Sequence, residues 1–375
     1  MTNFNKISGF VTLTVTLIII LLVTAIVLMT GKMLSGEQRN ASNELRYREA
    51  MAAAQAGIDK AIANLMANNA SRASITSSIS PYYQVTFGTD ITIPVGNATI
   101  PVVQVTSVGT AGYSASAATS TDAESRAVIY QQAAVGKIVS GTPSAPLTVA
   151  AGMAAGGNFS VAANPNGGGP GVPLSIWSPA LVSIGSSSST CGQQEYYDGA
   201  CSSNPYSDNT TKGSDVLDND PAFPPNLLAY IFGVSTINEL VQKLNNQGRS
   251  VITDCSSLDT SSSGLYIVKG NCTPSGDVGS TANPVVLVVW NGNLTLNANR
   301  NFYGLVFAYA DAGATGFDIK LNGGATVYGA LVSNYQLGQS NGTYNAVYDS
   351  TVLQNISTGS AFSYIARVPG SWRDW

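Results

Sequence analysis

A long run of apolar positions near the N-terminus is the strongest pattern in this chain. Residues Met1–Gly9 are polar, with one charge at Lys6, and Phe10–Gly31 contains no charged residue. At about 1.5 Å per residue, this run would extend about 33 Å as a helix, enough to cross a bilayer core of about 30 Å. It is too long for the core of an ordinary signal peptide, and no small-residue cleavage site follows it. The pattern therefore predicts a helix that spans a membrane.

The helical pattern continues beyond the apolar run, from Lys32 to Asn69. Good helix formers dominate this stretch. Ile58, Ile62, Leu65 and Met66 have the spacing of one apolar stripe on a helix. We expect one nearly continuous helix of about 60 residues, or about 90 Å, that begins in the membrane and ends against a globular domain.

Four short segments after this helix are rich in β-branched residues and are separated by turn residues, which is typical of strands. They are Tyr82–Phe87, Ile91–Pro94, Val102–Val108 and Arg126–Ala134. We expect a small antiparallel sheet that the apolar stripe of the helix covers, so that residues 32–140 form one domain. The segment 140–146 (SGTPSAP) interrupts the pattern and is expected to be a linker.

A second, β-rich domain is expected over residues 147–366. In Pro284–Asn334, short apolar strands alternate with Asn-Gly turns. Asn301–Ala308 and Thr326–Ser333 resemble two copies of one repeat, about 25 residues apart, as in one turn of a parallel β-solenoid. Leu147–Gly171 is a candidate for an earlier turn. A β-sandwich is the alternative that the strand spacing leaves open.

An irregular insertion, about residues 186–283, contains all four cysteines of the chain. Their wide spacing and the absence of histidine argue against a zinc site, and in an exported chain disulfides are the expected state. Of the three possible pairings, Cys191–Cys201 with Cys255–Cys272 is favoured because it closes the shortest loops. Within the insertion, Asn226–Asn246 has helical spacing, with a break expected at Gly233.

The composition excludes several classes of protein. Only 10% of the residues are charged, 44% are hydrophobic, and the formal net charge is −4. A nucleic-acid partner is therefore not expected, because it requires a basic surface. The chain has no histidine, which excludes Ser-His-Asp and Cys-His catalysis. Gly338–Gly342 matches the G-x-S-x-G pattern, but no histidine is present to activate Ser340.

Five aspartates are the remaining candidates for chemistry. Asp215, Asp218 and Asp220 could ligate Ca²⁺, although such a cluster is more often an acidic solvated loop. Asp311 and Asp318 are the nearest candidates for a polysaccharide hydrolase on a solenoid, yet they belong to no paired-carboxylate motif. We therefore expect no catalysis and no cofactor, with calcium as the one candidate ligand.

Together, the N-terminal features resemble the precursor of a type IV pilin. The resemblance rests on a short leader that ends at Gly9, a hydrophobic run that begins at Phe10, and a helix that continues into the globular part. In this family a prepilin peptidase cuts after the leader glycine and methylates the new N-terminal residue, here Phe10. The resemblance implies a precursor in the bacterial inner membrane that later joins an extracellular pilus, where the apolar helix packs in the fibre core.

Further segments resemble the PilX-type minor pilins. Leu45–Leu65 (LRYREAMAAAQAGIDKAIANL) is similar to the alanine-rich helix of that group, and Val102–Val135 to a pair of its strands. The C-terminal segment Val368–Trp375 also resembles the ending of that group. The resemblance implies the major pilin, other minor pilins and the prepilin peptidase as partners, with a large tip adhesin as a further candidate.

One departure from the family concerns the fifth position after the predicted cut. Major pilins carry a Glu there, which pairs with the N-terminal amine of a neighbouring subunit, whereas this chain carries Thr14. In the family, subunits without this Glu tend to lie at the fibre tip, so Thr14 implies a tip or initiation subunit. Threonine is also tolerated in any helix, because its hydroxyl can bond to a backbone carbonyl. Both interpretations stay open.

The sequence therefore predicts an α+β protein with a long N-terminal helix on a small sheet, followed by a large all-β domain. Its predicted function is that of a minor pilin that primes or caps a type IV pilus and presents the β domain at the fibre tip. The alternative is an adhesin or carbohydrate-binding surface protein on a simple membrane anchor.

Overall fold

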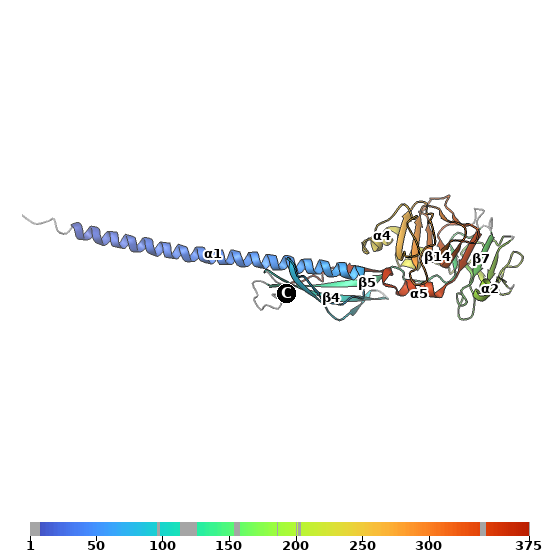
Figure 1. Ribbon diagram of the computed structural model, residues 1–375, viewed down its shortest axis with the longest axis horizontal. Coiled ribbons are helices and arrows are strands. Elements are labelled where there is room, and N and C mark those ends of the chain that lie inside the picture. The colour runs from blue at the N-terminus through green and yellow to red at the C-terminus, as the bar shows by residue number, and fades with distance from the viewer. Residues whose placement is uncertain are drawn as a thin grey trace, which may run out of the picture. The chain divides into compact units, whose positions relative to one another are not determined.

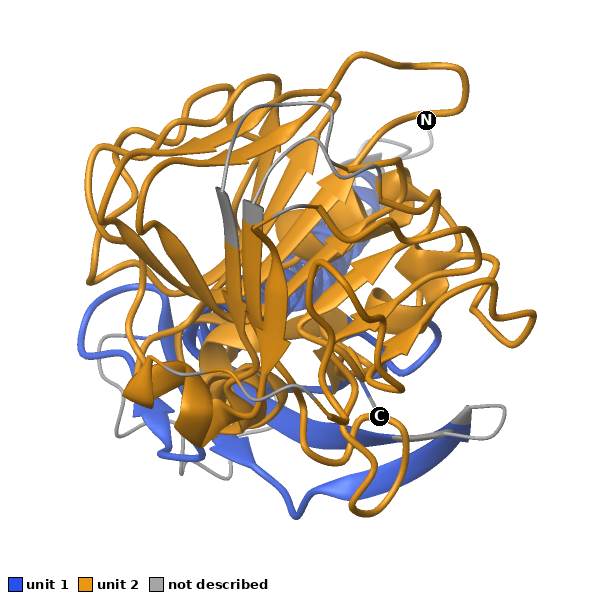
Figure 2. Ribbon diagram, turned by 90° about the vertical axis from the view of Figure 1, so that its right-hand side faces the viewer, with its two compact units in different colours: residues 1–64, 71–133, 367–375 blue, residues 65–70, 134–366 orange. Residues whose placement is uncertain are grey.

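The computed structural model describes residues 8–95, 98–112, 126–153, 158–185, 187–199, 201, 204–337 and 343–374. The chain divides into two units (Figure 2). Unit 1 comprises residues 1–64, 71–133 and 367–375, and unit 2 comprises residues 65–70 and 134–366. Most of unit 2 is thus inserted into the sequence of unit 1, because the chain leaves unit 1 after residue 133 and returns to it at residue 367.

Helix α1 runs from Ser8 to Ala67 without interruption (Figure 1). The single long helix expected from the sequence is confirmed. A Cβ atom on Gly31 or Gly36 would meet no atom within 4 Å. Neither glycine breaks the helix, since the surrounding residues are good helix formers.

The strands of the small sheet are β1 (Ile75–Thr76), β2 (Tyr82–Phe87), β3 (Ile91–Val95), β4 (Ala98–Thr110), β5 (Arg126–Lys137) and β18 (Ser363–Arg367). In the described residues their order is β1-β2-β4-β5-β18, and β3 also pairs with β4. Both β2 and β3 run antiparallel to β4. Buried and less buried residues alternate along β5, so one face of the sheet is covered. The predicted antiparallel sheet is confirmed.

The face of α1 that is buried in unit 1 consists mostly of small residues. Ala50, Ala53, Ala54 and Gly57 are buried together with Ile58. Their spacing of three and four residues places them on one face of the helix. Small side chains let the helix backbone approach the sheet closely.

The apolar stripe predicted for the end of this helix is partly wrong. Ile58, Ile62 and Leu65 are buried, but Met66 is 42% exposed. Met66 directly follows Leu65, and a step of one residue turns the side chain by about 100° around the helix axis.

Unit 2 contains a parallel β-solenoid. Its longest strands, which pair in chain order and all run parallel, are β11 (Gly264–Lys269), β12 (Val285–Trp290), β14 (Asn301–Tyr309) and β16 (Thr326–Ser333). Asn301 is paired with Thr326, so these two turns are 25 residues apart and the predicted repeat is confirmed. A sandwich would require antiparallel sheets, and that alternative is wrong.

Shorter strands complete the solenoid, some in the same large sheet and two, β13 and β15, in a separate small sheet. They are β13 (Leu294–Leu296), β15 (Ile319–Leu321), β17 (Thr343–Val347), β7 (Asn158–Ala162) and β9 (Ser189–Cys191). β13 pairs with β15, and β7 lies between β17 and β9, again with parallel strands. Apolar side chains fill the interior, among them Leu287, Val306, Leu321 and Val327.

The stacking order of the solenoid differs from the order of the chain. β6 (Leu147–Val149) pairs with β16, and β7 pairs with β17, so the first strands of unit 2 lie against its last ones. From β6 the stack continues through β8 (Ile176–Trp177) to β10 (Val216–Leu217). The chain then returns to the opposite end of the stack and begins again at β11. Leu147–Gly171 therefore contributes to turns of the solenoid, as predicted, but at the middle of the stack.

Helices cover the outer face of the large sheet. They are α3 (Leu227–Phe232), α4 (Ile237–Asn245) and α5 (Ser350–Thr358), followed by the 3-10 helix η3 (Ser360–Phe362). Their apolar residues pack with the outward side chains of the strands, such as Leu305 and Phe307. The helical segment predicted at Asn226–Asn246 consists of α3 and α4, and Gly233 ends α3 with φ of 62°.

The segment 186–283 is less irregular than expected. It contains strands β9, β10 and β11 of the solenoid, and helices α2 (Gln193–Asp198), α3 and α4. β9 and β10 are only 3 and 2 residues long. Such short strands carry too few alternating positions to be recognised from sequence.

Candidate functional site

The N-terminal third of α1 is an exposed apolar surface. Leu17, Leu21 and Leu28 are 61%, 64% and 70% exposed, and the most apolar stretch of the helix has no buried residue. Within the described residues, α1 is the one helix that is long and apolar enough to cross a membrane. An apolar surface of this size requires lipid or other apolar helices around it.

Threonine hydroxyls in this segment bond to the helix itself. The Oγ1 atoms of Thr16, Thr24 and Thr30 each donate to backbone carbonyl oxygens three and four residues earlier, at 2.9–3.1 Å. The threonines are therefore compatible with an apolar surrounding. Thr14 lies in the same exposed segment, and no carboxylate occurs between Phe10 and Gly31. The apolar segment of α1 thus carries no negatively charged side chain.

The predicted processing site lies at the start of α1. Gly9 and Phe10 belong to its first turn, because the helix begins at Ser8. Residues 1–7 of the predicted leader lie outside the described residues. Cleavage between Gly9 and Phe10 stays a prediction.

The C-terminal segment completes the fold of unit 1. Tyr130 and Arg373 exchange two backbone hydrogen bonds, of 2.8 and 3.1 Å, and the Arg373 guanidinium lies 5.2 Å from the centroid of the Tyr130 ring. The amide group of Gln131 donates to the Ser371 hydroxyl at 2.6 Å. The indole of Trp372 donates to Gln55 of α1 at 3.2 Å. The segment that resembles a PilX-type ending thus holds strand β5 and the helix together.

Two disulfides tie loops to the solenoid. The structure joins Cys191 to Cys201 and Cys255 to Cys272, with Cα–Cα distances of 4.9 and 5.3 Å. Cys191 belongs to β9, and the backbone of Cys272 pairs with that of Leu294 of β13 in an isolated parallel β-bridge. One cysteine of each pair therefore lies in a stacked turn, and the other lies in a loop that the disulfide holds against that turn.

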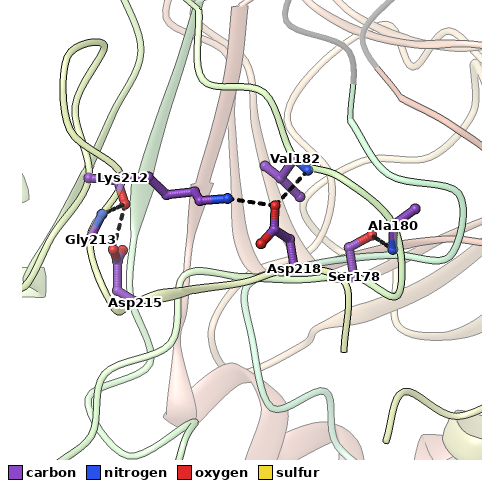
Figure 3. Close-up of polar contacts among 8 residues, drawn as sticks. Ser178, Ala180, Val182, Lys212, Gly213, Asp215 and Asp218 are labelled. Atoms are coloured by element: carbon purple, nitrogen blue, oxygen red, sulfur yellow. Dashed lines mark hydrogen bonds and ion pairs between the residues drawn. The ribbon is translucent and has the colours of Figure 1, made fainter. Parts of the chain in front are cut away.

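Two of the calcium candidates are engaged with the protein (Figure 3). Asp215 is fully buried, and its Oδ1 accepts a hydrogen bond of 2.7 Å from the Ser207 hydroxyl. Asp218 pairs with the Lys212 ammonium at 2.7 Å and accepts the Val182 amide at 3.1 Å. Burial raises the pKa of Asp218, but the Lys212 and Val182 contacts outweigh this effect and hold the pKa below its usual value.

The third candidate has a partner of its own. Asp220 accepts a hydrogen bond of 2.7 Å from the Trp177 indole. Each of the three carboxylates therefore bonds to different residues, and no partner is shared. The part of the chain that the structure describes contains no group of three or more His, Cys, Asp or Glu residues placed to hold a metal ion.

The two aspartates considered for catalysis, Asp311 and Asp318, bond to neighbouring residues of the solenoid. Asp311 accepts hydrogen bonds from the Trp290 indole at 2.9 Å and from the Asn291 amide group at 2.7 Å. Asp318 accepts the backbone amide of Ile319 at 2.8 Å. Both aspartates thus stabilise turns of the solenoid. Ser340 lies outside the described residues.

A ladder of hydrogen bonds between Asn side chains and backbone amides runs along the solenoid and was not expected from the sequence. The Oδ1 atom of Asn271 accepts the amide of Asn293 at 2.9 Å, and that of Asn293 accepts the amide of Asp318 at 2.7 Å. These residues precede the apolar residues Cys272, Leu294 and Ile319. An Asn or Asp before each apolar segment was the signal that could have revealed these turns.

Comparisons with known proteins match the N-terminal region. Residues 8–59 match the family model described as PilX N-terminal. The match includes the exposed apolar part of α1 and most of the alanine-rich part that is buried in unit 1. The comparisons found no match among curated proteins and none among solved structures.

Proposed function

Because residues 8–59 match the PilX N-terminal family model, we propose that this chain is a minor pilin that primes or caps the assembly of a type IV pilus. In this proposal α1 leaves the inner membrane and enters the fibre core, and unit 2 is presented at the fibre tip. The activity is assembly and display, without catalysis.

The observation that carries the proposal is the exposed apolar part of α1, which contains no carboxylate. With Thr14 in place of an acidic residue, the apolar part of α1 has no side chain to neutralise the amine of a subunit ahead of it. A buried amine without a partner is costly. A position with no subunit ahead avoids this cost, and the tip is that position.

The size of unit 2 supports the same position. Residues 134–366 form a solenoid with covering helices, inserted between β5 and the end of the chain. A subunit within the shaft would have to place this volume between regularly packed neighbours. At the tip it projects without obstruction. The proposed partners are the major pilin, other minor pilins and the prepilin peptidase, with a tip adhesin as a further candidate.

Counting and locating the subunit tests the proposal. Quantitative mass spectrometry of sheared fibres should find this chain far below the major pilin. Gold-labelled antibodies against residues 147–364 should decorate fibre ends, with antibodies against the major pilin as the control that decorates the shaft. Labelling of this chain along the whole shaft would refute the tip position and would make Thr14 a tolerated substitution.

A further inference from the structure

Two tyrosines of neighbouring solenoid turns stack on the outer side of unit 2. Tyr303 of β14 is in register with Tyr328 of β16, and their ring centroids are 4.9 Å apart with planes only 12° from parallel. Each ring covers a face of the other. The stacked pair therefore presents mainly ring edges and hydroxyl groups to the surroundings.

Helix α2 adds two more tyrosines to this pair. The rings of Tyr196 and Tyr197 are 5.7 Å apart and nearly perpendicular, and Tyr197 is 61% exposed. Burial raises the pKa of Tyr328 to about 12, with smaller contributions from Tyr196, Tyr197 and Tyr303. Contacts of the neighbouring residues place these elements side by side. The Gln193 amide group of α2 donates to the carbonyl oxygen of Tyr348 at 2.6 Å, and Val347 of β17 is in register with Tyr328.

A carboxylate lies beside this group of phenols. Asp349 also raises the pKa values of Tyr197 and Tyr328, after the larger effect of burial. Its Oδ1 accepts the amides of Thr351 and Val352 at 2.9 and 3.0 Å and caps helix α5. Its Oδ2 receives no hydrogen bond from the described residues, and the hydroxyl groups of the four tyrosines make none with them either.

The chemistry of this tyrosine cluster (Tyr196, Tyr197, Tyr303, Tyr328 and Asp349) restricts its ligand. The cluster contains no cation, and the carboxylate repels anions. A quaternary ammonium ion needs open ring faces around it, whereas Tyr303 and Tyr328 cover each other. Four phenols and one free carboxylate oxygen offer donors and acceptors to hydroxyl groups, and the exposed Tyr197 ring offers an apolar surface.

We infer that the tyrosine cluster binds a neutral sugar residue of a surface glycan. The sugar hydroxyls would bond to Asp349 Oδ2 and to the phenols, and its C–H face would lie on the Tyr197 ring. This inference rests on the proposed display of unit 2 at the fibre tip and names the class of ligand that unit 2 would contact there.

Glycan binding by the full-length chain tests the inference. The protein is placed in lipid nanodiscs, because maltoside detergents would compete, and is applied to an array of neutral, sialylated and amino-sugar glycans. Asp349→Asn keeps the α5 cap, since Asn and Asp cap equally well, but it removes the carboxylate. This variant and the double variant Tyr303→Phe with Tyr328→Phe should each lose at least about tenfold in affinity for a neutral glycan. Tyr309→Phe, at the far end of β14, is the matched control and should bind like the unmodified chain.

Three results would overturn the inference. They are no binding to neutral glycans, equal losses in the Tyr309→Phe control, or displacement of the glycan by choline at lower concentration than by free sugar. Thermal unfolding of each variant must match the unmodified chain. Gold labelling of fibre ends with Asp349→Asn separates this inference from the proposed function. If Asp349→Asn loses glycan binding but still labels fibre ends, both proposals are supported. If the unmodified chain binds neutral glycans but labels the whole shaft, the tip position alone is refuted.

Discussion

Gly109 of strand β4 lies directly beneath Ala54 of helix α1. A Cβ atom at position 109 would stand 2.8 Å from the Ala54 Cα and would overlap the carbonyl oxygen of Ala50. A Cβ atom on Gly57 of the helix would instead overlap a side chain, the hydroxyl group of Ser107 on the same strand. At Gly109 the helix and the strand therefore meet through their backbones, and this contact limits how closely they can approach.

Replacing Gly109 by Ala should push the helix off the sheet. The added methyl group meets backbone atoms, which cannot rotate away, so a destabilisation of about 1–3 kcal/mol is expected. Chemical denaturation of the full-length chain in nanodiscs measures it. Gly112→Ala is the matched control, because its Cβ would meet nothing within 4 Å. Equal stability of the two variants would contradict the close contact.

Replacing Gly9 by a bulky residue should block removal of the leader. The precursor would then stay in the inner membrane, because the charged leader cannot enter an apolar fibre core. Mass spectrometry of the unmodified chain should find an N-methylated Phe10, and the Gly9 variant should retain Met1 and lose incorporation into pili. An unmodified chain that keeps residues 1–9 would favour the alternative of a simple membrane anchor.

Peptide mapping without reduction should recover two cross-linked pairs, Cys191 with Cys201 and Cys255 with Cys272. Removing either pair by serine substitution should cost on the order of 2–4 kcal/mol, because the unfolded chain gains freedom that the disulfide had restricted. Labelling of free thiols in the oxidised protein, or a different pairing, would show this assignment to be wrong.

The ion pair of Asp218 with Lys212 should make part of the stability depend on pH. The pKa of Asp218 is lowered in the folded chain. Its contribution is therefore present above the unfolded pKa and is lost as the pH falls through the lowered folded value. The stability difference between the unmodified chain and Asp218→Asn, about 1 kcal/mol or less, should shrink between about pH 5 and about pH 2.

Lys212→Met provides the control for this titration. It removes the positive charge beside Asp218 and leaves the hydrogen bond from the Val182 amide. The pH-dependent part of the stability that Asp218 contributes should therefore be smaller in this variant. A difference between Asp218→Asn and the unmodified chain that stays constant down to about pH 2 would argue against the ion pair as its source.

Features that depend on near neighbours in the chain could be predicted from the amino-acid sequence. The membrane-capable helix follows from the uncharged run Phe10–Gly31, and the helix break at Gly233 follows from one residue type. The 25-residue period of Asn301 and Thr326 was also readable, because parallel turns repeat the same local pattern. Each of these signals lies within one repeat or less, where side-chain spacing and backbone geometry are directly coupled.

The contacts between distant segments could not be predicted from the sequence and became visible in the folded chain. Folding brought Leu147 beside Leu331, so that the solenoid stacks in an order other than that of the chain. It placed alanines, and not Met66, on the buried face of α1. It also paired the backbone of Arg373, near the C-terminus, with that of Tyr130. Pairing between distant segments is chosen by the packing of the whole core and by backbone hydrogen bonds, to which local spacing contributes no preference.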